Sequence, residues 1–278
     1  MTGQEQVRAW RPDLAGVSEV LHGRFTGFSY PMHAHDVWTL LIVDDGRIKY
    51  DLDRRERGVL GNGVILLPPH IPHNGCSVTS EGFQKRVLYL ETSQLSKRLS
   101  GTAVENPIPD DPTLRQRIHQ LHITLLQRGN EFEAESRLQF IIERLHQHLK
   151  QPAPAAESPT QETRIAHLLH DLLDEHFVEG ISLRKAADIL HAHPTHLVRA
   201  FSREFGMSPH QYVIGRRVSL ARRLLLAGHP AQTVAELTGF YDQSHLARNF
   251  KRLVGTSPVK YARSGPLTKT AGQHVKAG

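Results

Sequence analysis

The sequence of 278 residues predicts an α+β chain in which an all-β domain and a helical hairpin precede an all-α domain. Three observations predict this order. Short apolar runs broken by Gly and Pro fill residues 18–92, apolar residues at helical spacing fill residues 111–149, and a pattern of sixteen positions occurs twice after residue 190. A chain of this length suits two modest domains.

The predicted β domain covers residues 1–110. Runs such as GVILLPP and RVLYLE are typical of strands in a sandwich or barrel, because they are short, apolar and bounded by turn residues. Asp45-Gly46 predicts a hairpin turn, since Gly takes positive φ without a steric penalty.

Residues 111–150 are predicted to form a helical hairpin. Two stripes of Leu and Ile recur at three- or four-residue steps, over 114–126 and 138–149, on either side of the segment GNEFEAE. These stripes need an apolar partner, which can be the β domain, the other stripe or a second subunit.

Residues 151–162 are predicted to be a linker, because QPAPAAESPT is rich in Pro, Ala and small polar residues and has no hydrophobic period. The all-α domain follows over 163–264. Basic residues concentrate here: residues 181–278 hold 15 Lys and Arg but only 4 Asp and Glu, whereas residues 1–155 hold 18 of each. Such a field suits a polyanion, because each bound phosphate releases counterions.

The all-α domain contains an internal repeat at an offset of 49 residues, with eight identical pairs. The pairs are Leu197/Leu246, Arg199/Arg248, Phe201/Phe250, Arg203/Arg252, Gly206/Gly255, Ser208/Ser257, Pro209/Pro258 and Tyr212/Tyr261. Each copy predicts a helix-turn-helix unit, over 183–204 and 231–254. Gly239 supplies positive φ in the second turn, where the first turn has His191.

Residues 209–228 between the two units predict one helix of roughly 18 residues, about 27 Å long at 1.5 Å per residue. A rod of this length can hold two recognition helices about one DNA turn apart, ~34 Å.

Other sequence features exclude several classes of protein. A single cysteine, Cys76, excludes an intramolecular disulfide and a zinc cluster of cysteines. There is no long apolar run, no signal peptide and no nucleotide-binding motif, so we expect a cytoplasmic protein without a membrane partner.

Residues 163–263 resemble the AraC/XylS family of transcription regulators, above all in TVAELTGFYDQSHLARNFKRLVGTSPVKYAR. The resemblance implies a sequence-specific regulator of bacterial promoters, without enzyme activity, that dimerises through the hairpin and has RNA polymerase as a further partner. It places base contacts at Thr195, Val198 and Arg199 in the first unit and at Gln243, Ser244 and Arg248 in the second. The two arginines suit guanine, because the guanidinium fork matches O6 and N7. We assign Arg203, Lys251 and Arg252 to phosphates.

Residues 27–73 resemble a cupin barrel, through Gly27, His33, His35, Thr39 and Gly46 in its first motif and Gly63, Pro69 and His73 in its second. The resemblance implies an effector pocket, for which we choose His33, His35, Trp38, Thr39 and His73. In metal-binding cupins three histidines and a glutamate hold the ion, and here Thr39 replaces the glutamate. The three histidines can still hold Zn²⁺, Fe²⁺ or Ni²⁺.

Three interpretations of the N-terminal half stay open: an effector pocket without a required cofactor, a metal-dependent sensor, and a cupin enzyme with an accessory DNA-binding module. A further alternative for the C-terminal half is a DNA binder without sequence preference. In that case, replacing Arg199 and Arg248 by alanine weakens binding to all sequences alike.

Overall fold

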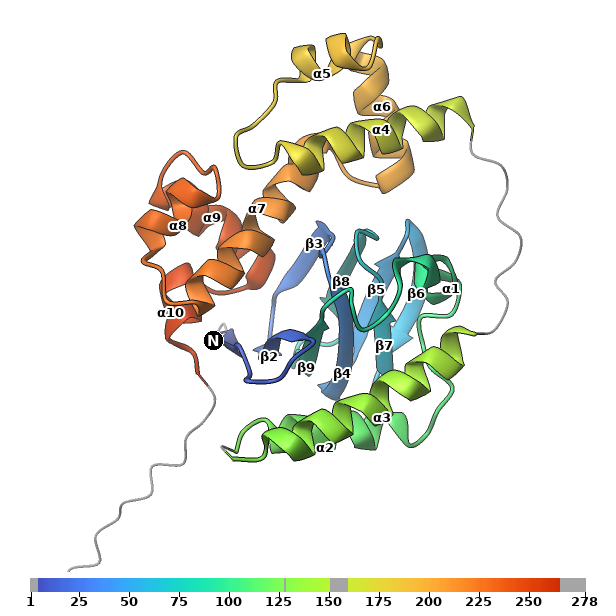
Figure 1. Ribbon diagram of the computed structural model, residues 1–278, viewed down its shortest axis with the longest axis vertical. Coiled ribbons are helices and arrows are strands. Elements are labelled where there is room, and N and C mark those ends of the chain that lie inside the picture. Colours follow the sequence, from blue (N-terminus) through green and yellow to red (C-terminus); the bar gives the residue numbers. More distant parts are fainter. Residues whose placement is uncertain (1–4, 128, 151–159, 266–278) are drawn as a thin grey trace, which may run out of the picture.

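The computed structural model describes residues 5–127, 129–150 and 160–265, which form two antiparallel sheets followed by helices (Figure 1). The first sheet has the order β1-β2-β9-β4-β7, with β1 (Gln6–Trp10), β2 (Val17–Phe25), β9 (Phe83–Leu90), β4 (Trp38–Gly46) and β7 (Val64–Leu67). The second has the order β3-β8-β5-β6, with β3 (Ser29–His33), β8 (His73–Ser77), β5 (Ile48–Leu52) and β6 (Arg55–Leu60). The predicted fold class is confirmed.

The first sheet is buried on both faces. Along β4, Leu41 and Val43 join the core between the two sheets, whereas Trp38, Leu40 and Ile42 join a second core on the outer face. Successive side chains of a strand point to opposite faces, and burial of both faces explains why β4 begins as the run WTLLIV, in which only Thr39 is polar.

The helical hairpin covers this outer face. It consists of α2 (Leu114–Thr124) and α3 (Glu131–Leu149), and the short helices η1 (Lys97–Leu99) and α1 (Ser100–Glu105) precede it. The apolar stripes of α2 and α3 pack on each other and on Trp38 and Leu40, so both the other stripe and the β domain are their partners. The buried stripe residues include Leu114, Ile118, Leu121, Leu138, Ile141 and Leu145.

The prediction of a hairpin at Asp45-Gly46 is wrong. Gly46 does have a φ of +74°, and a Cβ there would lie 2.2 Å from the carbonyl oxygen of Gly82. However, β4 pairs with β7 and β9, whereas β5 pairs with β6 and β8. The turn therefore carries the chain from one sheet to the other, because turn residues fix the local backbone but not the pairing of the flanking strands.

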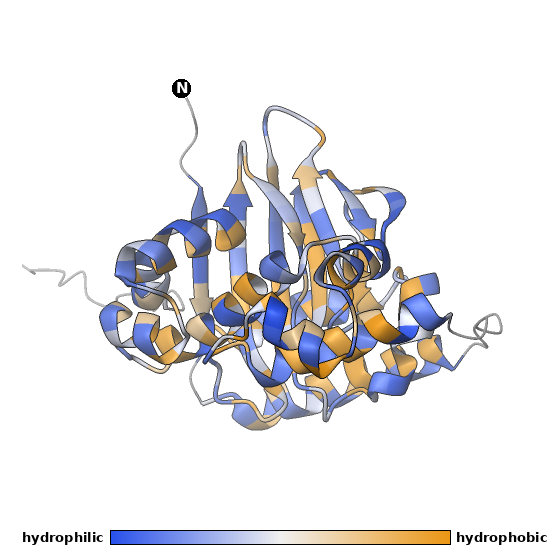
Figure 2. Cartoon of the chain, turned by 90° about the horizontal axis from the view of Figure 1, so that it is seen from above, coloured by the Kyte–Doolittle hydropathy of each residue, from blue (hydrophilic) through white to orange (hydrophobic). Residues whose placement is uncertain are grey.

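The C-terminal helices form two helix-turn-helix units joined by one long helix. The helices are α4 (Gln161–Glu175), α5 (Leu183–Ile189), α6 (Pro194–Phe205), α7 (Pro209–Leu226), α8 (Ala231–Leu237), α9 (Gln243–Val254) and α10 (Pro258–Arg263). The units are α5–α6 and α8–α9, and α7 between them has 18 residues, as predicted. Most of the predicted linker, residues 151–159, lies outside the described residues, and its last two residues begin α4. None of the described helices is long and apolar enough to span a membrane. Hydrophilic and hydrophobic residues are mixed along the helices (Figure 2).

The turns have the backbone that the sequence predicts. His191 and Gly239 have φ of +48° and +73°. Gly206 and Gly255, with φ of +63° and +83°, end α6 and α9 in the left-handed conformation. Ser208 then caps α7 by accepting a hydrogen bond from the backbone N–H of residue 211.

The helical domain is docked on the barrel through buried charges. Arg222 of α7 donates from Nη2 to Oε1 of Glu19 on β2 at 2.6 Å and from Nε to the hydroxyl of Tyr261 at 3.0 Å. Arg222 is 6% exposed and Glu19 is 4% exposed. The Tyr261 hydroxyl also donates to Glu19. These three residues link β2, α7 and α10 in one network.

Candidate ligand pocket and nucleic-acid interface

A cavity of about 60 Å³ lies inside the barrel, and the helical domain supplies part of its wall. Most of its wall comes from apolar and aromatic side chains of both sheets, and Arg222, Leu253 and Val254 supply the wall on the side of α7 and α9. No sequence pattern predicts these three residues in the cavity, because only the docking of the two domains brings them to the barrel.

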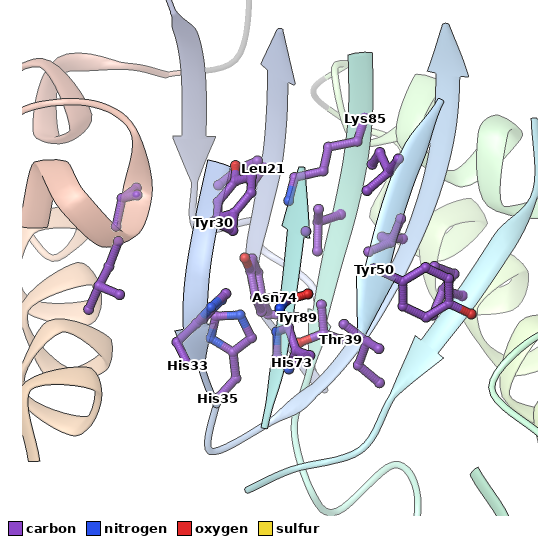
Figure 3. Close-up of a pocket in the computed structure, with 18 of the residues that line it drawn as sticks. Leu21, Tyr30, His33, His35, Thr39, Tyr50, His73, Asn74, Lys85 and Tyr89 are labelled. Atoms are coloured by element: carbon purple, nitrogen blue, oxygen red, sulfur yellow. The ribbon is translucent and has the colours of Figure 1, made fainter. Parts of the chain in front are cut away.

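Three histidines meet at one end of the cavity (Figure 3). His33 on β3 and His73 on β8 are direct partners across the two strands, and His35 follows in the loop after β3. The ring centroids are 4.4 Å apart for His33 and His73, 4.9 Å for His33 and His35, and 5.1 Å for His35 and His73. One ligand nitrogen from each ring lies within 4.8 Å of the other two.

Two of these rings have a fixed tautomer. Nδ1 of His33 lies 2.7 Å from the carbonyl oxygen of Pro31, and Nδ1 of His73 lies 3.0 Å from that of Ile71. A carbonyl oxygen only accepts, so each Nδ1 carries the proton and each Nε2 keeps its lone pair. Burial lowers the pKa of His33 and His35 well below the usual value and that of His73 to about 4, so the three rings are neutral at pH 7.

These residues fit a divalent metal ion on three nitrogens. Histidine ligands of metals almost always donate their second ring N–H to a carbonyl or carboxylate, as His33 and His73 do here. Thr39, the replacement for the glutamate, faces the same cavity, and its Oγ1 is buried without a hydrogen-bond partner among the described residues. A buried hydroxyl without a partner is costly, so it marks a place for a further polar group.

Two cations, Arg222 and Lys85, line the cavity. Arg222 has its counter-charge in Glu19, and its guanidinium lies 4.2 Å from the centroid of the Tyr89 ring. The Lys85 ammonium lies 3.9 Å from the centroid of the Tyr30 ring and has no carboxylate partner among the described side chains. Burial and, to a smaller extent, Arg222 lower the pKa of Lys85 to about 7.

Of the five residues predicted for the pocket, four line it and Trp38 does not. Trp38 is completely buried in the core under α2 and α3, where its Nε1 donates to the carbonyl of Leu95 at 2.8 Å. It directly precedes Thr39 on β4, so the alternation of the strand turns it to the opposite face of the sheet. Its place in the pocket is therefore a wrong prediction.

The predicted base-reading residues lie on the first two turns of α6 and α9. Thr195 and Arg199 are exposed on α6, and Gln243, Ser244 and Arg248 are exposed on α9. Val198 is half-buried and lines a separate cavity between α4, α6 and α7. The N-terminal turns of recognition helices are the parts that contact base edges.

The three residues assigned to phosphates are all exposed, but they differ in their contacts. Lys251 and Arg252 lie at the end of α9, and Arg252 donates to Asn249 at 3.1 Å. Arg203 pairs with Glu162 of α4 at 2.6 Å, and its backbone carbonyl accepts from Arg54 in the turn between β5 and β6. In this arrangement the guanidinium group of Arg203 pairs with a carboxylate and not with a phosphate.

Comparison with known proteins identifies both halves of the chain. Residues 186–264 match the family model of a helix-turn-helix domain, and residues 15–142 match that of the AraC-like ligand binding domain. The multiple antibiotic resistance protein MarA of Salmonella typhimurium is 31% identical over 96 residues, which are 34% of this chain and 76% of MarA. This chain belongs to the AraC family.

Longer matches support this assignment. The HTH-type transcriptional regulator YisR of Bacillus subtilis is 22% identical over 258 residues, covering 85% of this chain and 89% of YisR. The crystal structure of ToxT from Vibrio cholerae superposes with a TM-score of 0.57 at 13% identity, covering 93% of this chain and 97% of ToxT, so the two share a fold. The AraC-family chain is thus a transcription regulator with a ligand-binding and a DNA-binding domain.

Proposed function

We propose that this AraC-family regulator reads promoter DNA with α6 and α9 and that a small molecule in the barrel cavity controls this binding. One observation carries the proposal: Arg222, Leu253 and Val254 of the DNA-binding domain line the same cavity as His33 and His73 of the barrel. A ligand there touches both domains. It therefore has different contacts when the domains are docked and when they are apart, which is the condition for control by a ligand.

The size of the cavity limits the ligand. About 60 Å³ holds a few waters, since one water needs ~10–15 Å³ of such volume. One solved structure of ToxT has an unsaturated fatty acid bound. A ligand of that size would have to part the two domains in this protein, whereas a molecule of a few heavy atoms would fit as they stand.

Bases are read by the exposed residues of the two recognition helices. Arg199 and Arg248 occupy the same position in the two repeats, four residues before the exposed Arg203 and Arg252. We assign the first pair to guanine and the second pair, with Lys251, to phosphates. Arg203 is free for a phosphate once it leaves Glu162.

We further propose that two subunits bind together, in the bacterial cytoplasm, and that RNA polymerase is a partner on the promoter. The buried stripes of the hairpin cannot serve as the dimer surface, but α3 exposes Phe132 by 83% and Phe140 by 55%, and α2 exposes Ile123 by 45%. These apolar side chains make the outer face of the hairpin the candidate dimer surface. We expect no catalytic turnover.

The test is binding of the purified chain to the DNA upstream of its own gene, by fluorescence anisotropy at a stated salt concentration with competitor DNA. We expect a sequence-specific complex that the Arg199→Ala/Arg248→Ala variant loses. Arg164→Ala, which removes an exposed arginine from α4, is the matched control and should bind like the wild type. Equal weakening on all sequences would contradict base reading by these two arginines.

A further inference from the structure

A second cavity, of about 480 Å³, lies within the helical domain. Its wall is formed by α4, α5, α6 and α7, by the connection between α4 and α5, and by one residue of α9. It shares no lining residue with the barrel cavity. Protein interiors are close-packed and hold few voids larger than a water molecule, so a space of this size requires an explanation.

The internal repeat shows where the space comes from. Residues 176–182 connect α4 to α5, whereas only residues 227–230 connect α7 to α8 in the second unit. In the second unit α8 lies close to both α7 and α9, but in the first unit α5 lies close to α6 and hardly approaches α4 (Figure 1). The longer connection thus leaves the first unit open at a place where the second unit is packed.

Arg217 of α7 holds this longer connection in place and lines the cavity. Its Nε donates to the carbonyl of Phe177 at 2.6 Å, and its Nη2 donates to that of Val178 at 3.4 Å. No carboxylate among the described residues pairs with Arg217, although its neighbour Arg216 pairs with two. A guanidinium has five N–H donors, so Arg217 keeps further donors and an unpaired positive charge for a ligand.

The rest of the lining combines an apolar wall with a few polar groups. None of the described lining residues is Asp or Glu, whereas three are histidines, which can donate further hydrogen bonds. Such a set favours an anion at the polar side and apolar groups elsewhere. The apolar wall includes Leu169, Leu173, Ala186, Val213 and Ile214, and the histidines are His176, His210 and His245.

We propose that this cavity is a second ligand site, separate from the barrel cavity, and that it binds a small carboxylic acid with an apolar body. The carboxylate pairs with Arg217, because an arginine and a carboxylate form a charge-assisted and often bidentate pair. The apolar body lies against Leu169 and Leu173 of α4. Ligand pockets of ~300–1,000 Å³ have this composition, with mostly apolar walls and a few polar groups that fix the orientation.

The ligand contacts both recognition helices, because Val198 of α6 and His245 of α9 line the cavity. Val198 is one of the residues that the sequence assigns to base contacts, so an occupant beside it changes how α6 meets the DNA. This consequence rests on the proposed function, whereas binding of the carboxylic acid does not.

Binding is tested on the full chain by isothermal titration calorimetry with 4-phenylbutyrate and with 4-phenylbutyramide, which has the same ring and chain without the charge. We expect one 4-phenylbutyrate per chain and at least tenfold weaker binding of the amide. In Arg217→Gln the two compounds should bind with equal affinity. Equal affinities in the wild type, or no binding of millimolar 4-phenylbutyrate, would overturn the proposal.

Val213→Phe tests the position of the site. Val213 is half-buried on α7 and lines the cavity, so a phenyl ring there fills the space. Affinity for 4-phenylbutyrate should fall at least tenfold. The matched control is Val259→Phe, at an exposed position of α10, which should bind like the wild type. Equal binding by the two variants would refute the site.

The thermal midpoint of Val213→Phe checks that the space is real. A ring that fills a void should not lower the midpoint, whereas a ring forced into a packed core should. A midpoint well below that of Val259→Phe would therefore contradict the cavity.

Promoter affinity is measured separately, with and without 4-phenylbutyrate. It should change at least threefold in the wild type and stay constant in Val213→Phe. A chain that binds 4-phenylbutyrate with unchanged promoter affinity would refute the link to α6. A chain that binds 4-phenylbutyrate but no promoter would contradict the proposed function and support the site.

Discussion

Replacing Glu19 by glutamine tests whether the buried charge pair holds the DNA-binding domain on the barrel. The Glu19 side chain is 6% exposed and that of Arg222 is 7% exposed. Glutamine keeps the shape of the side chain but leaves the guanidinium without a counter-charge. Breaking a buried pair in this way costs ~3–5 kcal/mol. Arg222 keeps its contacts with Tyr261 and the Tyr89 ring, so we expect about 3 kcal/mol.

A loss of this size lowers the equilibrium constant for docking of the two domains about 100-fold, since 1.4 kcal/mol is a factor of ten. Hydrogen–deuterium exchange with mass spectrometry measures the loss of docking segment by segment. Amides of β2 and α10 that docking protects should exchange faster in the variant, whereas those under α2 and α3 should not change. Promoter affinity without effector should change as well, because the domains are less often docked.

The matched control is Glu56→Gln. Glu56 pairs with Lys49 at 2.9 Å, but the two side chains are 62% and 47% exposed, so the pair contributes less than about 1 kcal/mol. If Glu19→Gln exchanges no faster than Glu56→Gln, the buried pair does not hold the domains together. If all amides exchange faster, the variant destabilises the barrel itself, and the reasoning about docking is equally wrong.

Three further predictions concern stability, each measured by urea unfolding. Leu138→Ala, at the centre of the core under α3, should cost ~2–5 kcal/mol, and a loss below 1 kcal/mol would contradict that packing. Gly239→Ala should destabilise, because a Cβ there meets a carbonyl oxygen at 2.1 Å, whereas His191→Gly should stabilise or be neutral at its φ of +48°. Burial lowers the pKa of His22 to about 4 and that of His122 well below 6.5, so below pH 6.5 only the unfolded chain takes up these protons. Stability should therefore fall by about 1.4 kcal/mol per pH unit for His22 between pH 6.5 and 4, and His122 should add a loss in the same direction below pH 6.5; equal midpoints at pH 7.5 and 5 would contradict this.

Local patterns in the sequence predict most of the helices and strands. The repeat located α6 and α9, and the Ser-Pro pairs located the starts of α7 and α10. The cupin-like spacing predicts that His33, His35 and His73 lie close together, and in the structure they do. Strand alternation could have excluded Trp38, since two adjacent residues of one strand cannot both face the cavity.

Other features depend on contacts that no local pattern contains. Arg222 is one of four arginines in GRRVSLARR, and its partner Glu19 lies 203 residues earlier. The apolar run of β4 likewise indicates that both faces of the strand are buried, but it does not indicate that β7 and β9 are the neighbouring strands. The residues that close the cavity were missed for the same reason: they belong to the other domain.

The position of α9 indicates how the proposed ligand of a few atoms would affect the proposed base contact of Arg248. Leu253 and Val254 line the cavity, and Arg248 lies five and six residues earlier on the same helix, ~8 Å away at 1.5 Å per residue. A helix of this length moves as a unit, so a shift of its cavity end shifts Arg248 with it. The first recognition helix is held differently, since Arg54 of the barrel binds the carbonyl of Arg203 near its end. Both recognition helices thus contact the barrel at their C-terminal ends, and their relative placement depends on how the two domains are docked.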